Sequence, residues 1–366
     1  MGLCGDHGLA GRLCEADAAA GAGRGGVGSA GGPAAVGWGV REATDAEIRT
    51  VLARFGLSDA STKRLAGGFS GSHVWRIQSE RGDCCLKRSP QMTPRRHGEI
   101  CRLIIAARDA GLTFLPEFAQ ADDGKFHVEF RASLWDVADW MPGSADFHAS
   151  PSPARLRVAC LALARLHCIW GQGGLEVKRC PAVVRRINAA REWLEVTRPR
   201  LSNWLNAAGP KPECALQALA IVNRRAADVL RLLEPWRMML PVQPCLCDIW
   251  HDHLLFTGND LTGLIDFGAV KHDNVAVDLA RMLGSLVEDN AELYAEGLEV
   301  YQSVRQLTGW EVRLVPLLDR TGIVIGLANW LRRLFLQEEE IYDRAAAERR
   351  MAVLVRRAEK WDDDWL

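Results

Sequence analysis

The hydrophobic pattern of this chain changes period near residue 140, and this change limits the folds that the chain can adopt. Between residues 63 and 88, apolar and polar residues alternate in short runs separated by turns that contain glycine, as in antiparallel hairpins. From residue 152 onward, apolar residues recur at the spacing of amphipathic helices. Pro142 and Gly143 interrupt both patterns. The sequence therefore predicts an α+β protein with a strand-rich amino-terminal part and a mainly helical carboxy-terminal part.

The same pattern predicts the domain boundaries and the main elements. We expect a disordered leader over residues 1–40, a strand-rich lobe over residues 41–140 and a helical lobe over residues 141–366. The elements expected in the two lobes are, in chain order, a helix in "TDAEIRTVLARFGL" (44–57), strands between 63 and 88, a helix in "RRHGEICRLIIAARDAGL" (95–112), strands at 125–130 and 134–140, a helix at 152–170, helices within 181–238, a strand pair at 254–256 and 262–266, and helices within 275–360.

Composition restricts the location and the partners of the protein. The first forty residues are rich in Gly and Ala and lack the continuous apolar core of a signal peptide. The eleven cysteines are odd in number and show no repeating spacing, so they indicate a reducing cytoplasmic environment rather than a disulfide scaffold. A net charge of −1 gives no reason to expect nucleic acid or an anionic membrane as a partner. No apolar run reaches the roughly 18 residues that span a bilayer, and the nearest is "TGIVIGLANWL". We expect a soluble cytoplasmic protein, whose oligomeric state the sequence does not indicate.

A glycine-containing turn and a nearby lysine point to a phosphate-binding site in the amino-terminal lobe. Gly67, Gly68 and Gly71 lie between two predicted strands, where glycines allow backbone N–H groups to approach a phosphate closely. Lys87 on the next strand can reach the same phosphates, and Glu99 on the following helix can orient Lys87 by an ion pair. Each feature also has an ordinary interpretation, as a hairpin turn, a surface lysine or a solvated helical glutamate. Taken singly, they are weak signals of a nucleotide site.

Two aspartates in the carboxy-terminal lobe carry the strongest chemical signal. Asp248 lies in a loop within "CDIWHDHLLF", and Asp266 ends a predicted strand eighteen residues later in "LIDFGAV". Phosphoryl transfer needs one carboxylate to accept or orient the attacking hydroxyl, and another to hold the metal ion that neutralises phosphate charge. Asp248 and Asp266 are the candidates for these two roles.

The order of these motifs resembles that of the aminoglycoside phosphotransferase and choline kinase superfamily, relatives of the protein kinases. The resemblance covers roughly residues 60–340, and the segments "LALARLH" and "DWMPG" also resemble the family. Family members typically read His-Gly-Asp, then Asn, then Ile-Asp, then Asp-Leu-Ala. The corresponding positions here are Leu246-Cys247-Asp248, His253, Ile265-Asp266 and Asp278-Leu279-Ala280. The resemblance implies a two-lobe protein-kinase-like fold, with a small antiparallel β lobe, a larger helical lobe and ATP bound in the cleft between them.

The chain departs from the family pattern around the predicted catalytic residue. Leu246 and Cys247 replace the His-Gly before the catalytic Asp, and His253 replaces the metal-binding Asn. Magnesium prefers oxygen ligands, whereas imidazole suits ions such as Mn²⁺ or Zn²⁺ better. We therefore expect Mg²⁺, with Mn²⁺ as the alternative, held by Asp266 together with His253 or with an oxygen of Asp252.

Cysteines and histidines in the same stretch allow a different interpretation. Cys245, Cys247, His251 and His253 are residue types that can build a tetrahedral zinc site. Their spacing differs from that of zinc fingers and ribbons, so phosphoryl transfer is the favoured interpretation. Asp278 is interpreted as a carboxylate that begins a helix or braces a loop.

The sequence thus predicts a phosphotransferase that moves the γ-phosphate of ATP to a hydroxyl of a small molecule. Asp248 is the expected base, Asp266 the metal ligand and Lys87 the phosphate anchor. The alternative is a nucleotide-binding pseudokinase or regulatory protein without transfer activity, because the residues around Asp248 are altered. The acceptor is expected in the Arg-rich helical region of residues 175–240, which favours an acidic or phosphorylated molecule over a cationic drug.

Overall fold

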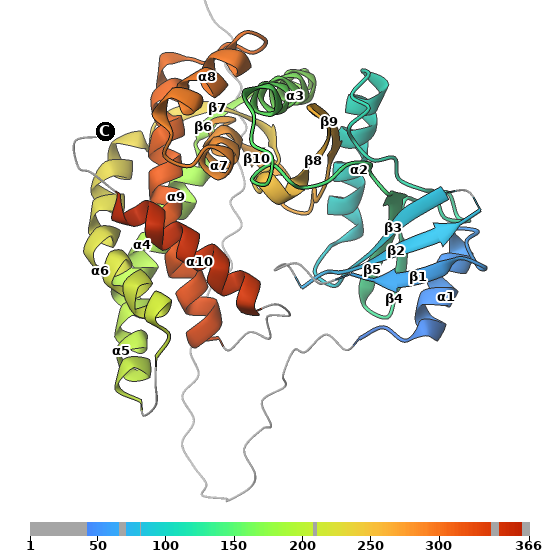
Figure 1. Ribbon diagram of the computed structural model, residues 1–366, viewed down its shortest axis with the longest axis horizontal. Coiled ribbons are helices and arrows are strands. Elements are labelled where there is room, and N and C mark those ends of the chain that lie inside the picture. Colours follow the sequence, from blue (N-terminus) through green and yellow to red (C-terminus); the bar gives the residue numbers. More distant parts are fainter. Residues whose placement is uncertain (1–41, 66–70, 81, 208–210, 338–343, 361–366) are drawn as a thin grey trace, which may run out of the picture. The chain divides into compact units, whose positions relative to one another are not determined.

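The computed structural model describes residues 42–65, 71–80, 82–207, 211–337 and 344–360. The expected leader, residues 1–40, lies outside these ranges. Within them, a small antiparallel sheet precedes a larger and mainly helical part, which is the two-lobe α+β fold expected from the sequence (Figure 1).

The small lobe is a five-stranded antiparallel sheet with the strand order β1-β2-β3-β5-β4. Its alternating sequence places Trp75 and Ile77 of β2 and Leu86 of β3 on one buried face. Ile48 and Leu52 of the first helix belong to the same core, so that helix covers this face. The elements of the lobe are α1 (Asp45–Arg54), β1 (Ser61–Arg64), β2 (His73–Ser79), β3 (Gly82–Ser89), α2 (Pro94–Asp109), β4 (Val128–Phe130) and β5 (Ser133–Asp139).

Helix α2 links the two parts of the protein. It begins where the Thr93 side chain accepts the Arg96 N–H and Pro94 occupies the first turn, as expected for a well-capped helix. Ile100 and Ile104 on its buried face belong to the large core of the helical lobe rather than to the core under the sheet. On the other side, His97 of α2 lies 3.5 Å from Asp136 of β5, so α2 contacts both lobes.

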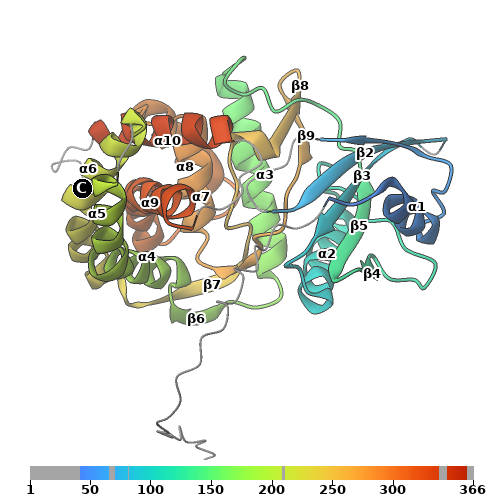
Figure 2. The ribbon, with the colours of Figure 1, turned by 90° about the horizontal axis from the view of Figure 1, so that it is seen from below.

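The larger lobe consists of helices and two small antiparallel sheets, ordered β10-β7-β6 and β8-β9. Helix α9 packs among α4, α6, α7 and α10 (Figure 2). The elements are α3 (Pro153–Gly171), β6 (Glu176–Arg179), α4 (Pro181–Glu192), a π-helical turn (Trp193–Thr197), α5 (Arg198–Asn206), α6 (Glu213–Leu233), a 3-10 turn (Glu234–Trp236), β7 (Met239–Cys245), a 3-10 turn (His251–His253), β8 (Leu254–Thr257), β9 (Asp260–Leu264), β10 (Lys271–Asp273), α7 (Ala276–Leu286), α8 (Ala291–Gln302), α9 (Gly309–Phe335) and α10 (Arg344–Glu359).

Helix α9 contains the apolar run "TGIVIGLANWL". It is the one helix in the described part of the chain whose length and composition would allow it to cross a membrane, and 72% of its most apolar window is buried inside the protein. Such burial is typical of the central helix of a globular core. Helix α7 approaches α9 closely at Gly284, where a Cβ atom would lie 2.0 Å from Asp319 Oδ1.

Gly143 lies at the predicted break between the two lobes. Its φ of +99° belongs to the left-handed region. A Cβ atom at this position would lie 2.8 Å from the carbonyl oxygen of Phe256. The next residue, Ser144, pairs with Phe256 through two backbone hydrogen bonds of 2.9 Å. Glycine is therefore needed here for both its conformation and its small size.

Candidate active site

The loop that carries Asp248 follows strand β7 and is braced by Asp278 from the first turn of α7. Asp278 accepts the backbone N–H groups of Leu246 at 2.7 Å and Cys247 at 2.6 Å. It also lies 3.0 Å from Nε2 of His167, whose Nδ1 lies 2.8 Å from the Tyr301 hydroxyl. Burial lowers the pKa of His167, so its neutral ring donates to Asp278 and accepts from Tyr301. The expectation that Asp278 braces a loop is confirmed.

Cys247 has the backbone conformation of a glycine. Its φ is +61°, in the left-handed region that side chains with a Cβ atom adopt at a cost. The resemblance places a glycine of the family pattern at this position. The turn before Asp248 is thus formed here by cysteine, in a conformation that glycine adopts most easily.

Asp248 forms an ion pair with a residue that was not among those expected from the sequence. Its Oδ1 accepts from Nη2 of Arg281, which lies on α7. Arg281 follows Asp278 by three residues, and positions three apart lie on the same face of a helix. That spacing was a signal from which Arg281 could have been predicted. One face of α7 therefore both braces the loop and contacts its aspartate.

Asp266 and Lys87 come together although 179 residues separate them in the sequence. Lys87 Nζ donates to Asp266 Oδ1 at 2.8 Å. Burial alone would raise the pKa of Asp266, but the Lys87 ammonium and the hydrogen bonds from Lys87 and the Gly268 N–H outweigh burial and lower the pKa to about 2. Asp266 also has a φ of +62°, which is unusual for a residue with a side chain. The structure thus joins the expected phosphate anchor to the expected metal ligand.

His253 lies between the two aspartates. Its Nδ1 is 2.8 Å from the carbonyl oxygen of Asp248, and its Nε2 accepts the indole N–H of Trp250 at 2.8 Å and lies 3.8 Å from Asp266 Oδ2. Burial lowers the pKa of His253, so the ring is neutral with its proton on Nδ1. Both ring nitrogens therefore already have partners, and this arrangement leaves no lone pair of His253 for a metal ion.

Asp252, the alternative ligand, lies on the outer side of the 3-10 turn. Its side chain is 48% exposed and pairs with His251 Nε2 at 3.3 Å. Within the described residues it forms no ion pair with Lys87, the partner of Asp266. Among the expected metal ligands, Asp266 is therefore the one with a carboxylate next to the phosphate anchor, and its hard oxygen suits Mg²⁺.

The expected ion pair between Lys87 and Glu99 is not formed. Glu99 is 48% exposed and pairs with Arg95 at 3.1 Å, one turn earlier on α2. The reason is helical geometry: α2 buries Ile100 and Ile104, and this directs Glu99 towards solvent. The carboxylate of the small lobe that does lie near Lys87 is Asp136, its partner in the register of β3 and β5.

Of the three glycines expected to bind phosphate, the structure describes one. Gly71 has a φ of +71°, and a Cβ atom at this position would meet no other atom within 4 Å, so Gly71 lies in an open turn before β2. Gly67 and Gly68 lie outside the described residues. The role of this turn in binding phosphate stays a prediction.

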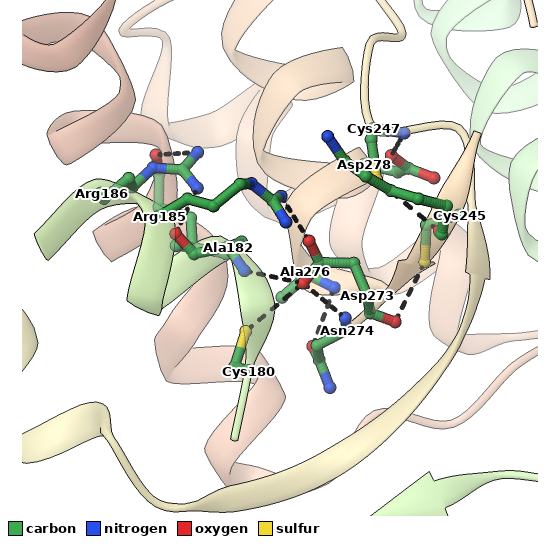
Figure 3. Close-up of polar contacts among 12 residues, drawn as sticks. Cys180, Ala182, Arg185, Arg186, Cys245, Cys247, Asp273, Asn274, Ala276 and Asp278 are labelled. Atoms are coloured by element: carbon green, nitrogen blue, oxygen red, sulfur yellow. Dashed lines mark hydrogen bonds and ion pairs between the residues drawn. The ribbon is translucent and has the colours of Figure 1, made fainter. Parts of the chain in front are cut away.

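The four residues of the zinc interpretation have separate partners. Cys245 Sγ donates to the carbonyl oxygen of Asp273 at 3.3 Å, and Cys247 Sγ lies 3.8 Å from the carbonyl oxygen of Lys271. The ring of His251 contacts Ser285 at 2.7 Å. Figure 3 shows Cys245 directed at Asp273, which also anchors the start of α4 through Ala182 and Arg185. The zinc interpretation is therefore not supported by the positions of these side chains.

The residues of the described ranges that come close enough together to hold a metal are His167, Cys245 and Asp278. All three are buried, and His167 and Asp278 already form the hydrogen bonds that brace the loop. This group is better explained as part of that structural network than as a metal site.

A cavity of about 520 Å³ opens beside the braced loop. Trp250 and Asp252 of the loop, Arg281 of α7 and Arg350 of α10 are among its lining residues. Since Arg281 also contacts Asp248, the cavity adjoins the carboxylate expected to act as base. A molecule in this cavity would lie next to the pair formed by Arg281 and Asp248.

Comparison with protein families gives a match over most of the chain. The family model described as the phosphotransferase enzyme family matches residues 61–314. The matched segment includes Lys87, Asp248, Asp266 and Asp278.

Curated relatives are similar over a shorter range. A homoserine kinase of Rhizobium etli is 33% identical over 177 residues, which is 44% of this chain and 53% of that protein. A homoserine kinase of Sinorhizobium medicae is 30% identical over 173 residues, which is 44% of this chain and 52% of that protein. The match thus spans about half the length of these relatives.

Solved structures share the fold at low identity. A spectinomycin phosphotransferase in complex with ADP and spectinomycin has a TM-score of 0.62 at 13% identity, over 84% of this chain and 95% of that one. An aminoglycoside phosphotransferase from Alicyclobacillus acidocaldarius has a TM-score of 0.56 at 17% identity, over 88% of this chain and 96% of that one. These similarities confirm the kinase-like fold.

Proposed function

The chain belongs to the phosphotransferase enzyme family, and on that premise we propose that it transfers phosphate from ATP to a hydroxyl group of a small molecule in the cytoplasm. One observation carries the proposal: the ring of His253 touches the carbonyl of Asp248 on one side and faces Asp266, the partner of Lys87, on the other. One ring thus joins the backbone of Asp248 to the carboxylate of Asp266, which in turn pairs with the Lys87 ammonium.

The residues divide into two roles. Lys87 would contact the phosphates of the nucleotide, and Asp266 would hold Mg²⁺, which supplies positive charge for the phosphate oxygens when it is bound. Asp248 would accept the hydrogen bond of the acceptor hydroxyl and take its proton. Arg281 holds one oxygen of Asp248 and so limits the directions in which the carboxylate can point. The relatives' names make homoserine the first acceptor to assay.

Substitution of the two aspartates tests this division of roles. Asp266→Asn should weaken the binding of ATP with Mg²⁺, because it removes the charged oxygen ligand. Asp248→Asn should leave that binding near the wild-type value and lower kcat by about 10²- to 10⁴-fold, the usual contribution of a positioned base. Binding is measured by calorimetry, and turnover by release of ADP with a panel of hydroxyl acceptors. Equal effects of the two substitutions on binding and on kcat would contradict the assignment.

Lys87→Ala provides a third measurement. A charge-assisted contact contributes roughly 1.5 to 3 kcal/mol, so nucleotide affinity should fall by about one to two orders of magnitude. The Arg95→Ala variant is a suitable control, since Arg95 is 90% exposed and pairs only with Glu99 on the same helix in the described structure. Unchanged affinity in Lys87→Ala would mean that the nucleotide binds elsewhere.

A nucleotide-binding pseudokinase is the second candidate. The observation in its favour is that Asp248 is already paired with Arg281 and that the lone pair of His253 Nε2 is taken by Trp250. In that case the protein would bind ATP, Lys87→Ala would weaken binding, and no acceptor would give turnover in either the wild type or the Arg281→Gln variant.

A further inference from the structure

The cavity beside the braced loop is strongly basic. Its wall is formed by the loop at Trp250–Asp252, by α7, α9 and α10, by Arg186 of α4, and by His148 and Glu288 from two connecting segments. The lining contains three acidic residues, Asp252, Glu288 and Asp319, and six basic ones, Arg186, Arg281, Arg349, Arg350, Arg356 and Arg357. Such an excess of arginine favours an anionic ligand.

Some of these arginines are neutralised by the protein itself. Arg357 of α10 pairs with Asp319 at 2.7 Å and with Asp289 at 3.1 Å, and Arg356 pairs with Glu288 at 2.9 Å. These three contacts tie α10 to α9 and to the segment after α7. Arg356 and Arg357 thus hold the wall of the cavity together, and their guanidinium groups are not available to a ligand.

Arg186 and Arg350 have no carboxylate partner of their own among the described residues. Arg186 donates to the carbonyl oxygens of Ala182 and Leu318, both at 3.3 Å. The guanidinium of Arg350 lies 3.5 Å from the centre of the Trp250 ring. Both side chains are half-buried, and burial lowers the pKa of each to about 10 in spite of the nearby carboxylates, Asp273 for Arg186 and Asp248 and Asp252 for Arg350.

Arg281 is the third arginine with N–H donors at the cavity, and it lies on the side next to Asp248. Its Nη2 is bound to Asp248, whereas its buried Nε has no hydrogen-bond partner within the described structure. A buried donor without a partner costs free energy, and so does a partly buried guanidinium that has no ion-pair partner in contact with it. An anion in the cavity would compensate for both.

We propose that this cavity binds an oxyanion of the phosphate acceptor, a carboxylate or a phosphate group, through Arg186 and Arg350. Guanidinium groups suit these anions because their planar N–H donors match two oxygens at once. The acceptor is then a hydroxy acid, a hydroxy amino acid or a phosphorylated alcohol, and not a cationic amine. That the bound anion belongs to the acceptor rests on the proposed function, whereas anion binding in the cavity is independent of turnover.

Anion binding is tested in the Lys87→Ala background, so that the nucleotide-phosphate site does not contribute. Calorimetry with inorganic phosphate and with succinate probes the two sources of the oxyanion, and choline serves as the cationic control. We expect one or both anions to bind, and Arg186→Gln and Arg350→Gln each to weaken that binding by about tenfold or more. Arg350→Lys, which keeps the charge but loses the planar donors, should weaken it less.

Arg344→Gln is the matched control. Arg344 belongs to the same helix α10 as Arg350, pairs with Glu348 and does not line the cavity, so anion binding should be unchanged. Thermal unfolding of each variant shows whether it is folded. Anion affinity that is the same in folded Arg186→Gln and Arg350→Gln overturns the proposal, as does failure of both anions to bind. Absence of turnover together with arginine-dependent anion binding would instead contradict the proposed function alone.

Discussion

Cys247 shows how a single residue can keep a conformation that its side chain opposes. Its φ of +61° costs a residue with a Cβ atom roughly 1–2 kcal/mol relative to glycine. Two N–H groups at this point are held by Asp278, which maintains the turn. The sequence showed that Leu246 and Cys247 replace the His-Gly of the family pattern, and the structure shows that Cys247 forms this turn in a left-handed conformation.

We predict that Cys247→Gly raises the free energy of unfolding by up to about 1 kcal/mol, because relief of the strained φ exceeds the added entropy of the unfolded chain. Cys247→Val should lower it by about 1–3 kcal/mol, since β-branched residues are least tolerant of this region. Urea unfolding measures both changes. Cys168→Gly, in α3, is the control and should lower the free energy of unfolding, because glycine disfavours the interior of a helix. A loss of similar size in Cys247→Gly would contradict the argument.

The residue at position 253 decides whether Asp266 has a second oxygen ligand beside it for the metal ion that we expect. In the structure its Nε2 accepts from Trp250, so the ring adds no oxygen ligand to that of Asp266. His253→Asn would place an amide oxygen at the position where the family has its metal-binding Asn. We predict that activity or nucleotide binding in the variant shifts towards Mg²⁺ relative to Mn²⁺. Titration of each ion at fixed ATP measures the ratio, and an unchanged ratio would show that His253 does not face the metal.

At the scale of elements, the packing of one helix or strand against the next decides which side chains reach the site. Helix α2 has the predicted position in the sequence, yet its rotation directs Glu99 to Arg95 and away from Lys87. Helix α7, by contrast, directs two polar side chains towards the site, because it brings Asp278 and Arg281 to the same loop. Both results follow from which face of each helix is buried.

The junction at Gly143 offers a test at this scale. We predict that Gly143→Ala lowers the free energy of unfolding by about 1–3 kcal/mol or more, because the residue has a φ of +99° and its Cβ would meet the Phe256 carbonyl. Denaturant unfolding measures the change. Gly173→Ala is the control, since a Cβ atom there meets nothing within 4 Å and φ is not in the left-handed region. Equal stability of the two variants would show that the junction can rearrange.

At the scale of the whole molecule, buried histidines make the fold sensitive to acid. Burial lowers the pKa of His167 and His253, and lowers that of His251 to about 4. In the unfolded chain these imidazoles bind protons near pH 6.5, whereas in the folded protein they do so only at lower pH. Their contribution to stability is therefore complete above pH 6.5 and is lost as the pH falls from 6.5 towards 4.

We predict that the free energy of unfolding decreases as the pH falls from 6.5 to 5, by up to about 1.4 kcal/mol per pH unit for each of these histidines. Urea unfolding at pH 7.5, 6.5, 5.5 and 5.0 measures the slope. His251→Gln should reduce the slope, because His251 is replaced by a side chain that does not titrate. A stability that stays constant between pH 7 and 5 would contradict the prediction.

The sequence alone predicted the fold class and the change of period near residue 140, and it named Asp248 and Asp266 as candidates, because these depend on periodicity and on the local order of motifs. Tertiary structure decided the rest. Lys87 meets Asp266 rather than Glu99, and Arg281 meets Asp248. The arginines of the cavity come from helices far apart in the sequence. A local pattern specifies how the backbone repeats and which face is apolar, but the partner of a polar side chain depends on how those faces pack together.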